Sequence, residues 1–400
     1  MTRGRVAAWT LAVLAVVGAG TAPTVGAKLD KSLIPLPEIL TDPNEGNTYG
    51  FLPVVLFLDE NKIIKYILAP DVRYNRITGV FPAFRLFGYP SIDKKWSVVL
   101  RKSQNIDEDY DLRYEDNAFW QDRLRLLANF EFERDSSERF YGFGNGSSED
   151  DESNYTAKET SALLWLSYQL RSKLELTYQS RLRVFRVKEG GVKSLPFIAQ
   201  AHEGTPGLGG ATIVGQEFGL RYDTRDDTNI PRRGGLGVLT AEIIPRVLGS
   251  SISIVKYAAE VRQFIPFRDR FVLAMHGRLD YIQGDDEVPF FEQNSIGGRR
   301  TLRGFGSGRF IDKDRFFASA ELRSRVYSRE IFGVNAELEL APFVDFGQVF
   351  RSSRDFFLDD LHAVGGLGFR GVVRPQVVGF VDIGFGEQGL AVFTGLEYPF

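Results

Sequence analysis

Apolar and polar residues alternate along much of this chain with a period of two. Within residues 270–282, Phe271 and Leu273 lie at one set of alternate positions, and His276 and Arg278 lie at the other. Such alternation is typical of β-strands that have one apolar face and one polar face. We therefore expect an all-β protein.

The alternating runs predict sixteen strands separated by turns and loops. Their lengths match or exceed the ~9–11 residues that a tilted membrane strand needs. The predicted strands cover residues 63–74, 77–88, 94–103, 106–116, 122–135, 157–170, 172–188, 211–225, 233–246, 251–267, 270–283, 313–327, 333–350, 360–373, 375–386 and 390–400.

The connections between these strands separate two kinds of β-protein, because alternation alone also fits a soluble sandwich. Tight connections such as 268–269 alternate with long ones at 136–156, 189–210 and 284–312. Short turns at one end and long loops at the other are typical of outer-membrane barrels. We predict a 16-stranded antiparallel transmembrane β-barrel.

The start of the chain predicts export. A positively charged beginning, an apolar run and small residues up to Ala27 indicate a signal peptide over residues 1–27. We expect residues 28–60 to form a periplasmic lead-in or plug, and residues 61–400 to form the barrel in the bacterial outer membrane.

Composition and charge exclude several kinds of chemistry. The chain has no cysteine, so disulfides and thiol catalysis are excluded, and its net charge of -3 gives no reason to expect nucleic acid as a partner. The histidines His202, His276 and His362 do not share a metal-ligand spacing. No phosphate loop or nucleophile elbow occurs, and nothing selects the Ser/His pair of a barrel-borne lipid hydrolase. We expect no enzyme, metal or cofactor.

Two motifs carry a family resemblance. Residues 297–310 read "GGRRTLRGFGSGRF" and include Arg303-Gly304-Phe305, and residues 343–347 read "FVDFG". The first resembles the Arg-Gly-Phe/Tyr signature of the sixth extracellular loop in the BamA/TamA superfamily of outer-membrane barrels. The second is similar to the F-x-D-x-G strand motif of that family.

The resemblance implies how these residues are arranged. In the family the sixth extracellular loop folds into the lumen, which is the fold expected here for loop 284–312. The family motif sets Phe343, Asp345 and Gly347 on the barrel wall, and Glu321 stands where the family has an acidic partner.

Physical chemistry supports such an arrangement. An arginine inside a barrel needs carboxylate partners, because an unpaired buried charge is costly. We predict that Arg303 pairs with Asp345 or Glu321 and lies against Phe343, since guanidinium bonds carboxylates bidentately and stacks on aromatic rings. Gly304 would allow close backbone approach.

The resemblance also implies a function, which is outer-membrane protein assembly, insertion or translocation without ATP. Its implied partners are outer-membrane lipid, nascent outer-membrane proteins or a separate periplasmic protein. Residues 28–62 are too few for a POTRA domain, so the chain resembles a short, POTRA-less member. We expect the seam to lie between 63–74 and 390–400, and Phe400 to serve as a C-terminal insertion signal.

A passive channel or structural barrel plugged by loop 284–312 is the alternative function. Alternating strands and an inward-folded loop fit this alternative as well as they fit an insertion role.

Overall fold

The computed structural model describes residues 29–61, 63–120, 123–331, 334–373, 377–396, 398 and 400. The predicted signal peptide, residues 1–27, lies outside the described residues.

Over the described residues, nineteen antiparallel strands form one sheet, and two short strands form a separate hairpin. The strands of the sheet are β1 (Asp30–Asp42), β2 (Gly46–Leu58), β3 (Ile64–Leu68), β4 (Asp71–Asn75), β5 (Gly79–Ser91), β6 (Lys94–Lys102), β7 (Glu108–Phe119), β8 (Leu124–Phe140), β9 (Ser153–Arg171), β10 (Leu174–Glu189), β11 (Ala211–Asp223), β12 (Gly234–Ile244), β13 (Ile254–Phe267), β14 (Phe271–Gly284), β17 (Asp314–Ile331), β18 (Val334–Phe350), β19 (His362–Val373), β20 (Val377–Gly386) and β21 (Gly389–Leu396). The hairpin consists of β15 (Asn294–Ile296) and β16 (Phe310–Asp312), and α2 (Ile198–Ala201) is a single helical turn.

The predicted all-β antiparallel fold is confirmed, but the sheet has more strands than the sixteen expected. Residues 28–60 were expected to form a lead-in or plug, and the structure instead places β1 and β2 of this segment in the sheet. The reason is that apolar residues occupy both faces of this hairpin. Leu33, Ile34 and Leu36 are all exposed in β1, so the segment lacks the alternation that marked the other strands.

A pair of prolines divides the predicted strand 63–74 into β3 and β4. Val55 faces Leu68 and Phe51 faces Val72, and this common register places Pro53 opposite Pro70. Neither proline has a backbone N–H, so the hydrogen-bond ladder is interrupted there.

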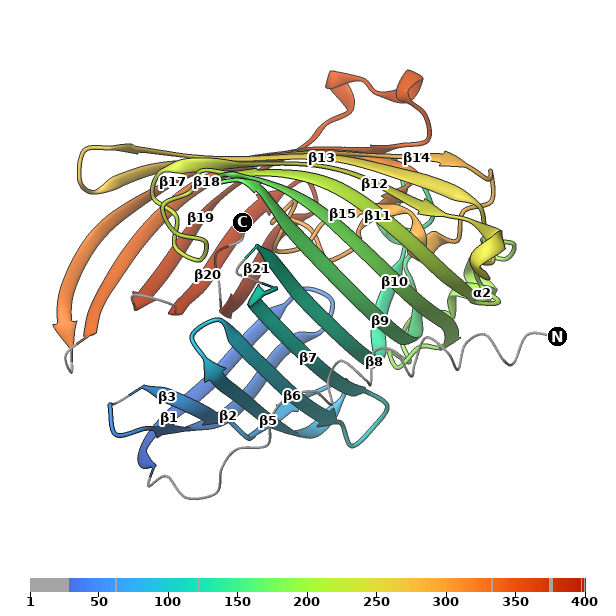
Figure 1. Ribbon diagram of the computed structural model, residues 1–400. Helices are drawn as coiled ribbons and strands as arrows, with labels where there is room; N and C mark the ends of the chain where they lie inside the picture. The colour runs from blue at the N-terminus through green and yellow to red at the C-terminus, as the bar shows by residue number, and fades with distance from the viewer. Residues whose placement is uncertain are drawn as a thin grey trace.

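The sheet curls until its first and last strands meet, as the ribbon in Figure 1 shows from blue β1 to red β21. The backbone N–H of Thr41 in β1 donates to Oγ1 of Thr394 in β21 at 2.8 Å. The seam predicted between 63–74 and 390–400 is therefore wrong on its first side, because β3 and β4 pair with β2 and β5 inside the sheet.

The extra hairpin also changes the position of the long loop between β14 and β17. When β3 and β4 are counted as one strand, this loop is the seventh described connection at its end of the barrel, whereas the predicted strands made it the sixth.

The two faces of the sheet differ in polarity. In β14, His276 and Asp280 are buried on the inner face, while Leu279 and Tyr281 are exposed on the outer face. Polar residues inward and apolar residues outward are what a membrane barrel requires. The part of the chain that the structure describes contains no helix long and apolar enough to cross a membrane.

Candidate functional site

The loop that connects β14 to β17 folds into the interior of the barrel. It contains a short 3-10 turn, η3 (Phe290–Glu292), and the β15–β16 hairpin. Leu302, Phe305 and Phe310 of this loop are almost completely buried. They pack with wall residues such as Phe343 and Val364 in one hydrophobic cluster, so the loop is part of the core rather than a solvent-exposed connection.

The structure places Arg303 against carboxylates of two wall strands. Its Nε and Nη2 donate to the two oxygens of Asp345 in β18 at 2.9 and 2.8 Å, and its Nη1 donates to Glu321 in β17 at 2.8 Å. The backbone N–H of Arg303 also donates to Asp345, at 3.1 Å. The guanidinium carbon lies 3.5 Å from the ring centroid of Phe343. Arg303 thus stacks on Phe343 with the planar face of its guanidinium and donates hydrogen bonds to the carboxylates with its N–H groups.

Three further residues complete this charged network. Arg303 Nη1 donates to Asp382 in β20 at 3.2 Å. Arg370 in β19 donates to Glu321 at 2.9 Å and is also paired with Asp382. Arg323 in β17 donates to the other oxygen of Glu321 at 2.8 Å.

The network therefore contains three cations and three anions, all of them buried. We call these six residues the arginine lock; they are Arg303, Glu321, Arg323, Asp345, Arg370 and Asp382. Because its charges balance and its members are mutually hydrogen-bonded, the cost of burying them is largely offset.

The charge state of Arg303 follows from its surroundings. Burial alone would lower the pKa of its guanidinium, but the carboxylates of Asp345 and Glu321 more than offset this, and the net effect raises the pKa above its usual range. Arg303 is therefore charged at neutral pH.

Glycines provide the space that the loop occupies. A Cβ on Gly304 would lie 2.8 Å from the backbone nitrogen of Gly386 and 2.9 Å from Val364 Cγ2. On the wall, a Cβ on Gly384 would collide with the carbonyl oxygen of Arg303, and a Cβ on Gly347 would lie 3.0 Å from the carbonyl oxygen of Phe316. The loop can approach the wall this closely because Gly304 and Gly384 lack side chains, whereas the close contact of Gly347 is to the neighbouring strand β17.

Phe305 packs against two other rings. Its ring meets those of Phe310 and His362 edge-on, with centroid distances of 5.2 and 5.6 Å. His362 in turn stacks on Phe310 at 3.9 Å. In three consecutive residues, Arg303 therefore provides the charge that binds the wall, Gly304 allows the backbone to approach the wall closely, and Phe305 packs in the hydrophobic cluster.

A second charged anchor lies near the start of the loop, at Glu292. This carboxylate is 1% exposed and accepts from three cations of the opposite wall. Arg183 in β10 and Lys256 in β13 each donate to it at 2.8 Å, and Arg181 in β10 donates at 2.9 Å. We call these four residues the glutamate anchor.

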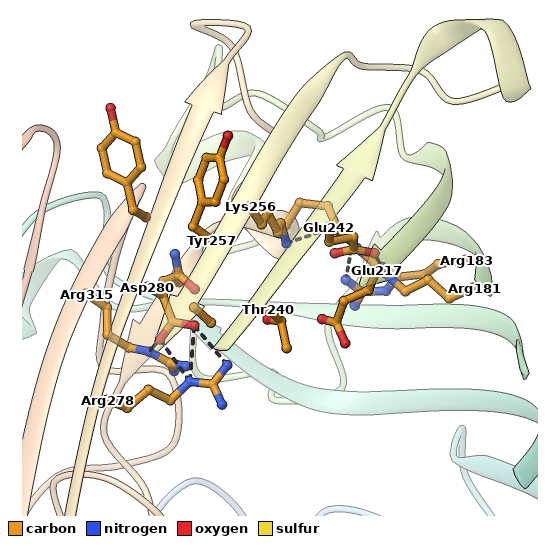
Figure 2. A pocket seen from close by; sticks show the side chains of 14 residues that line it. Arg181, Arg183, Glu217, Thr240, Glu242, Lys256, Tyr257, Arg278, Asp280 and Arg315 are labelled. Atoms are coloured by element: carbon orange, nitrogen blue, oxygen red, sulfur yellow. Dashed lines mark hydrogen bonds and ion pairs between the residues drawn. The ribbon is translucent and has the colours of Figure 1, made fainter. Parts of the chain in front are cut away.

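A chamber of ≈ 250 Å³ adjoins the glutamate anchor. Figure 2 shows Arg181, Arg183 and Lys256 gathered on one side of it, with Asp280 between Arg278 and Arg315 on the other. Asp280 accepts from Arg278 at 2.8 Å and from Arg315 at 2.7 Å. Asp280 on one side of the chamber and Glu292 on the other are therefore each paired with cations of the lining.

The pKa of Glu292 reflects these cations. Burial alone would raise the pKa of this carboxyl, but Lys256 and Arg181 outweigh burial and hold the pKa well below its usual range. Glu292 is therefore ionised at neutral pH.

Phe400 lies on the inner face of the barrel wall. Its side chain joins a buried cluster with Phe264, Val272 and Ala274. Its backbone oxygen accepts from Arg323 Nη2 at 3.2 Å, so the end of the chain contacts the arginine lock. The role of Phe400 as an insertion signal stays a prediction.

The structure brings together all the site residues named from the sequence except Phe400, which reaches them only through Arg323. Sequence reasoning missed Arg370, Asp382 and the glutamate anchor. Arg370 and Asp382 had a usable signal, since each is the one charged residue in its strand, within "HAVGGLGFRGVV" and "VVGFVDIGFG". Glu292 had none, because it is one of four acidic residues between positions 285 and 292.

Among the described residues, no group of three or more His, Cys, Asp or Glu side chains is placed to hold a metal ion. His276 contacts Glu260 at 3.1 Å, while His202 and His362 contact the backbone oxygens of Asp151 and Asn145 in the connection between β8 and β9.

The fold and the lock together define a class of protein, namely outer-membrane-type barrels with a loop bound inside the lumen. A family model described as the Omp85 superfamily domain matches residues 94–360. The chain belongs to the Omp85 superfamily, in agreement with the resemblance noted in its sequence. Membership implies an outer-membrane location. A comparison with curated protein sequences returns no match.

Two solved structures are similar to this chain. BamA from Haemophilus ducreyi lacking POTRA domains 1-3 has a TM-score of 0.57 and 15% identity, over 98% of this chain and 78% of that chain. CdiB from Acinetobacter baumannii has a TM-score of 0.47 and 12% identity, over 92% of this chain and 65% of that chain. At such identities the likeness to BamA shows the fold alone.

Proposed function

We propose that this chain assists the assembly, insertion or translocation of proteins at the bacterial outer membrane without ATP, after export through its signal peptide. Its partners would be outer-membrane lipid and nascent outer-membrane proteins, with or without a separate periplasmic protein. The Omp85 family match and the similarity to BamA support this proposal.

The observation that carries the proposal is the seam between β1 and β21. Neighbouring strands elsewhere in the described sheet are joined by hydrogen-bond ladders, but no ladder joins β1 to β21. Within the described residues, the hydrogen bonds between β1 and β21 run through the side chain of Thr394, which accepts from the Thr41 N–H and donates to the Ile39 carbonyl at 3.3 Å. A passive barrel gains from closing every edge, because unpaired backbone groups in a bilayer are costly.

The arginine lock supports this reading because of where it acts. Through its carboxylate partners, Arg303 ties together β17, β18 and β20, which precede β21 along the wall. These strands would stay rigid while the seam opens. We infer that the lock keeps one side of the seam fixed, so that opening is confined to the contact with β1.

A reversible cross-link tests the proposal directly. Because the chain has no cysteine, the double variant Thr41→Cys/Thr394→Cys would carry its only two thiols across the seam. We expect proteoliposomes containing the chain to speed the insertion of an unfolded outer-membrane protein. Oxidation of the double variant should abolish this acceleration, and reduction should restore it.

The two single-cysteine variants are the matched controls, since oxidation cannot join their seam. Arg303→Ala tests the contribution of the lock in the same assay. If the unmodified chain gives no acceleration over empty liposomes, this chain alone is not an insertion factor.

A passive barrel plugged by its own loop is the second candidate, favoured by one observation. The loop is held in the lumen at two separate points, Arg303 and Glu292. Planar-bilayer recordings distinguish the two functions. Steady, ion-selective conductance that rises in Glu292→Gln, without any insertion activity, would support the passive barrel.

A further inference from the structure

The outer face of the barrel carries an apolar hollow on the wall formed by β11, β12, β13 and β14, which lie side by side in Figure 1. We propose that this hollow binds an acyl chain of a glycerophospholipid from the periplasmic leaflet of the outer membrane. The strands β17, β18, β19 and β20 lie between the hollow and β21. The hollow is therefore separate from the seam that carries the proposed function.

The hollow has a volume of ≈ 480 Å³ and is lined mainly by apolar side chains. The larger side chains around it are exposed on the outer face; they are Leu220, Tyr222, Leu239, Val261 and Leu279. Its two charged residues turn away from the membrane, since Arg278 Nη1 donates to Glu260 on the inner face at 2.8 Å. Among the described residues that line the hollow, Tyr222 alone directs a hydrogen-bonding side chain outward.

Two glycines account for the depth of the hollow. The register places Gly237 of β12 opposite Val261 of β13, and Val261 opposite Gly277 of β14. A Cβ on Gly237 would meet no atom within 4 Å, and a Cβ on Gly277 would meet only a backbone oxygen at 4.0 Å. Packing within the barrel therefore does not require a glycine at either position.

Two other common reasons for a glycine inside a strand do not apply here. Pairing continues through Gly237 and Gly277 without a bulge on either side. Neither residue is among the glycines with positive φ. Glycine weakens a strand interior, and it often marks a place where a ligand approaches the backbone closely. At these two positions the open space lies outside the barrel, so the ligand comes from the membrane.

The surroundings of the hollow determine the chemistry of this ligand. The hollow is continuous with the apolar outer face, which hydrocarbon covers in a membrane barrel. An acyl chain needs no hydrogen bond from the wall, and a chain that fills the hollow gains dispersion contacts that a flat wall does not offer. A peptide segment would instead need partners for its backbone groups, which these side chains do not supply.

The position of the hollow along the strands indicates the leaflet. The inward-folded loop after β14 marks the extracellular end, and antiparallel pairing then places the beginning of β12 at the periplasmic end. Gly237 lies three residues after Gly234, the first residue of β12, which is roughly 10 Å along the strand. Each leaflet contributes about 15 Å to the hydrocarbon core. The acyl chain therefore belongs to a lipid of the periplasmic leaflet, which consists of glycerophospholipids.

Filling the hollow tests the proposal. Gly237→Leu/Gly277→Leu places two large side chains in it, and the full chain in detergent would be titrated with dioleoylphosphatidylglycerol and followed by native mass spectrometry. We expect the unmodified chain to bind this lipid at least about tenfold more tightly than the double variant. Gly365→Leu is the matched control, because Gly365 lies in β19, away from the hollow, and a Cβ there also meets no atom within 4 Å. The control should bind the lipid as the unmodified chain does.

A photoreactive lipid locates the bound chain. In proteoliposomes, phosphatidylglycerol with a diazirine in the middle of one acyl chain should label residues 237–239 and 259–261 severalfold more than Val344 and Phe346, which are exposed on the outer face of β18. This preference should disappear in Gly237→Leu/Gly277→Leu. A cooperative urea transition in detergent shows that the double variant is folded.

Several results would overturn the proposal. Equal affinity of the unmodified chain and the double variant would show that the hollow binds no lipid of its own. Uniform labelling of the outer face would mean that bulk lipid covers the hollow. A dimer that Gly237→Leu/Gly277→Leu converts to monomers would show that a second copy of the chain fills it. Stronger labelling by lipid A with the same diazirine would place the hollow in the other leaflet.

Discussion

The loop inside this barrel is held at two points of opposite polarity. At the arginine lock, a cation of the loop meets a wall that supplies the carboxylates of Glu321, Asp345 and Asp382. At the glutamate anchor, an anion of the loop meets a wall that supplies Arg181, Arg183 and Lys256 (Figure 2). Arg303 and Glu292 can therefore each bind only one of the two walls. If they were exchanged, Arg303 would face cations and Glu292 would face carboxylates.

The two anchors differ in how completely they are enclosed. The arginine lock is buried and contains equal numbers of cations and anions. The glutamate anchor borders a chamber of ≈ 250 Å³, and its cations have other partners, since Arg181 also pairs with Glu242 and Arg183 with Glu159. Replacing Arg303 should therefore lower the free energy of opening of the loop more than replacing Glu292 does.

The largest effect is expected from Arg303→Ala. This change leaves three buried carboxylates with only Arg323 and Arg370 as cationic partners, and breaking such a buried pair costs about 3–5 kcal/mol. The free energy of opening of residues 301–306, from native-state amide exchange in detergent, should fall by that amount.

Arg76→Ala is the control for Arg303→Ala, because Arg76 is exposed in the turn after β4. Arg303→Lys should recover part of the loss, since lysine restores the charge but not the bidentate fork. An unchanged opening free energy in Arg303→Ala would show that the lock does not hold the loop.

Glu292→Gln should have a smaller effect at the second anchor. The amide keeps the shape of the side chain but loses the charge that three cations share, and a hydrogen bond to a charged group contributes about 1.5–3 kcal/mol. Protease cleavage within residues 285–296 should become faster, while protection at residues 301–306 should change little. If both segments lose protection equally, the two anchors act as one unit.

Gly384→Ala tests the fit of the loop without changing any charge. A Cβ at this position would collide with the carbonyl oxygen of Arg303, and overpacking typically costs about 1–3 kcal/mol. Gly379→Ala in the same strand is the control, since a Cβ there meets no atom within 4 Å. Equal destabilisation by both variants, measured by urea unfolding in detergent, would rule out a steric role for Gly384.

A still smaller loss is expected from Phe343→Leu. Leucine keeps the apolar contact but removes the ring beneath the guanidinium of Arg303, and a cation–π contact of this kind contributes about 1–2 kcal/mol. Phe346→Leu on the outer face of the same strand is the comparison. If both changes weaken protection at residues 301–306 alike, stacking on Phe343 contributes nothing specific.

The smallest effect concerns pH. The folded pKa of Glu292 is well below its ordinary value, so its stabilising contribution is present above the unfolded pKa of about 4.3 and is lost only as pH falls through the folded pKa. Protection of residues 285–296 should stay constant between about pH 8 and 5. Loss of protection above about pH 5 that is absent in Glu292→Gln would contradict this.

Much of the fold could be predicted from the sequence, since each of the sixteen predicted strands corresponds to part of the sheet. The N-terminal hairpin could not, because Leu33, Ile34 and Leu36 place apolar side chains on both of its faces. The site was predictable where a motif marked it, as at Arg303 and Asp345. It was not predictable at Glu292, whose partners lie more than thirty residues away in the chain.

The sequence by itself determined the alternation that makes the wall, and the charged and aromatic residues that meet inside it. A period of two sets which side chains share a face, and this depends only on local backbone geometry. Tertiary structure alone decided which strands form the seam and which wall receives each anchor. Those outcomes depend on how the sheet curls and on its register, which bring together residues that are distant in the chain.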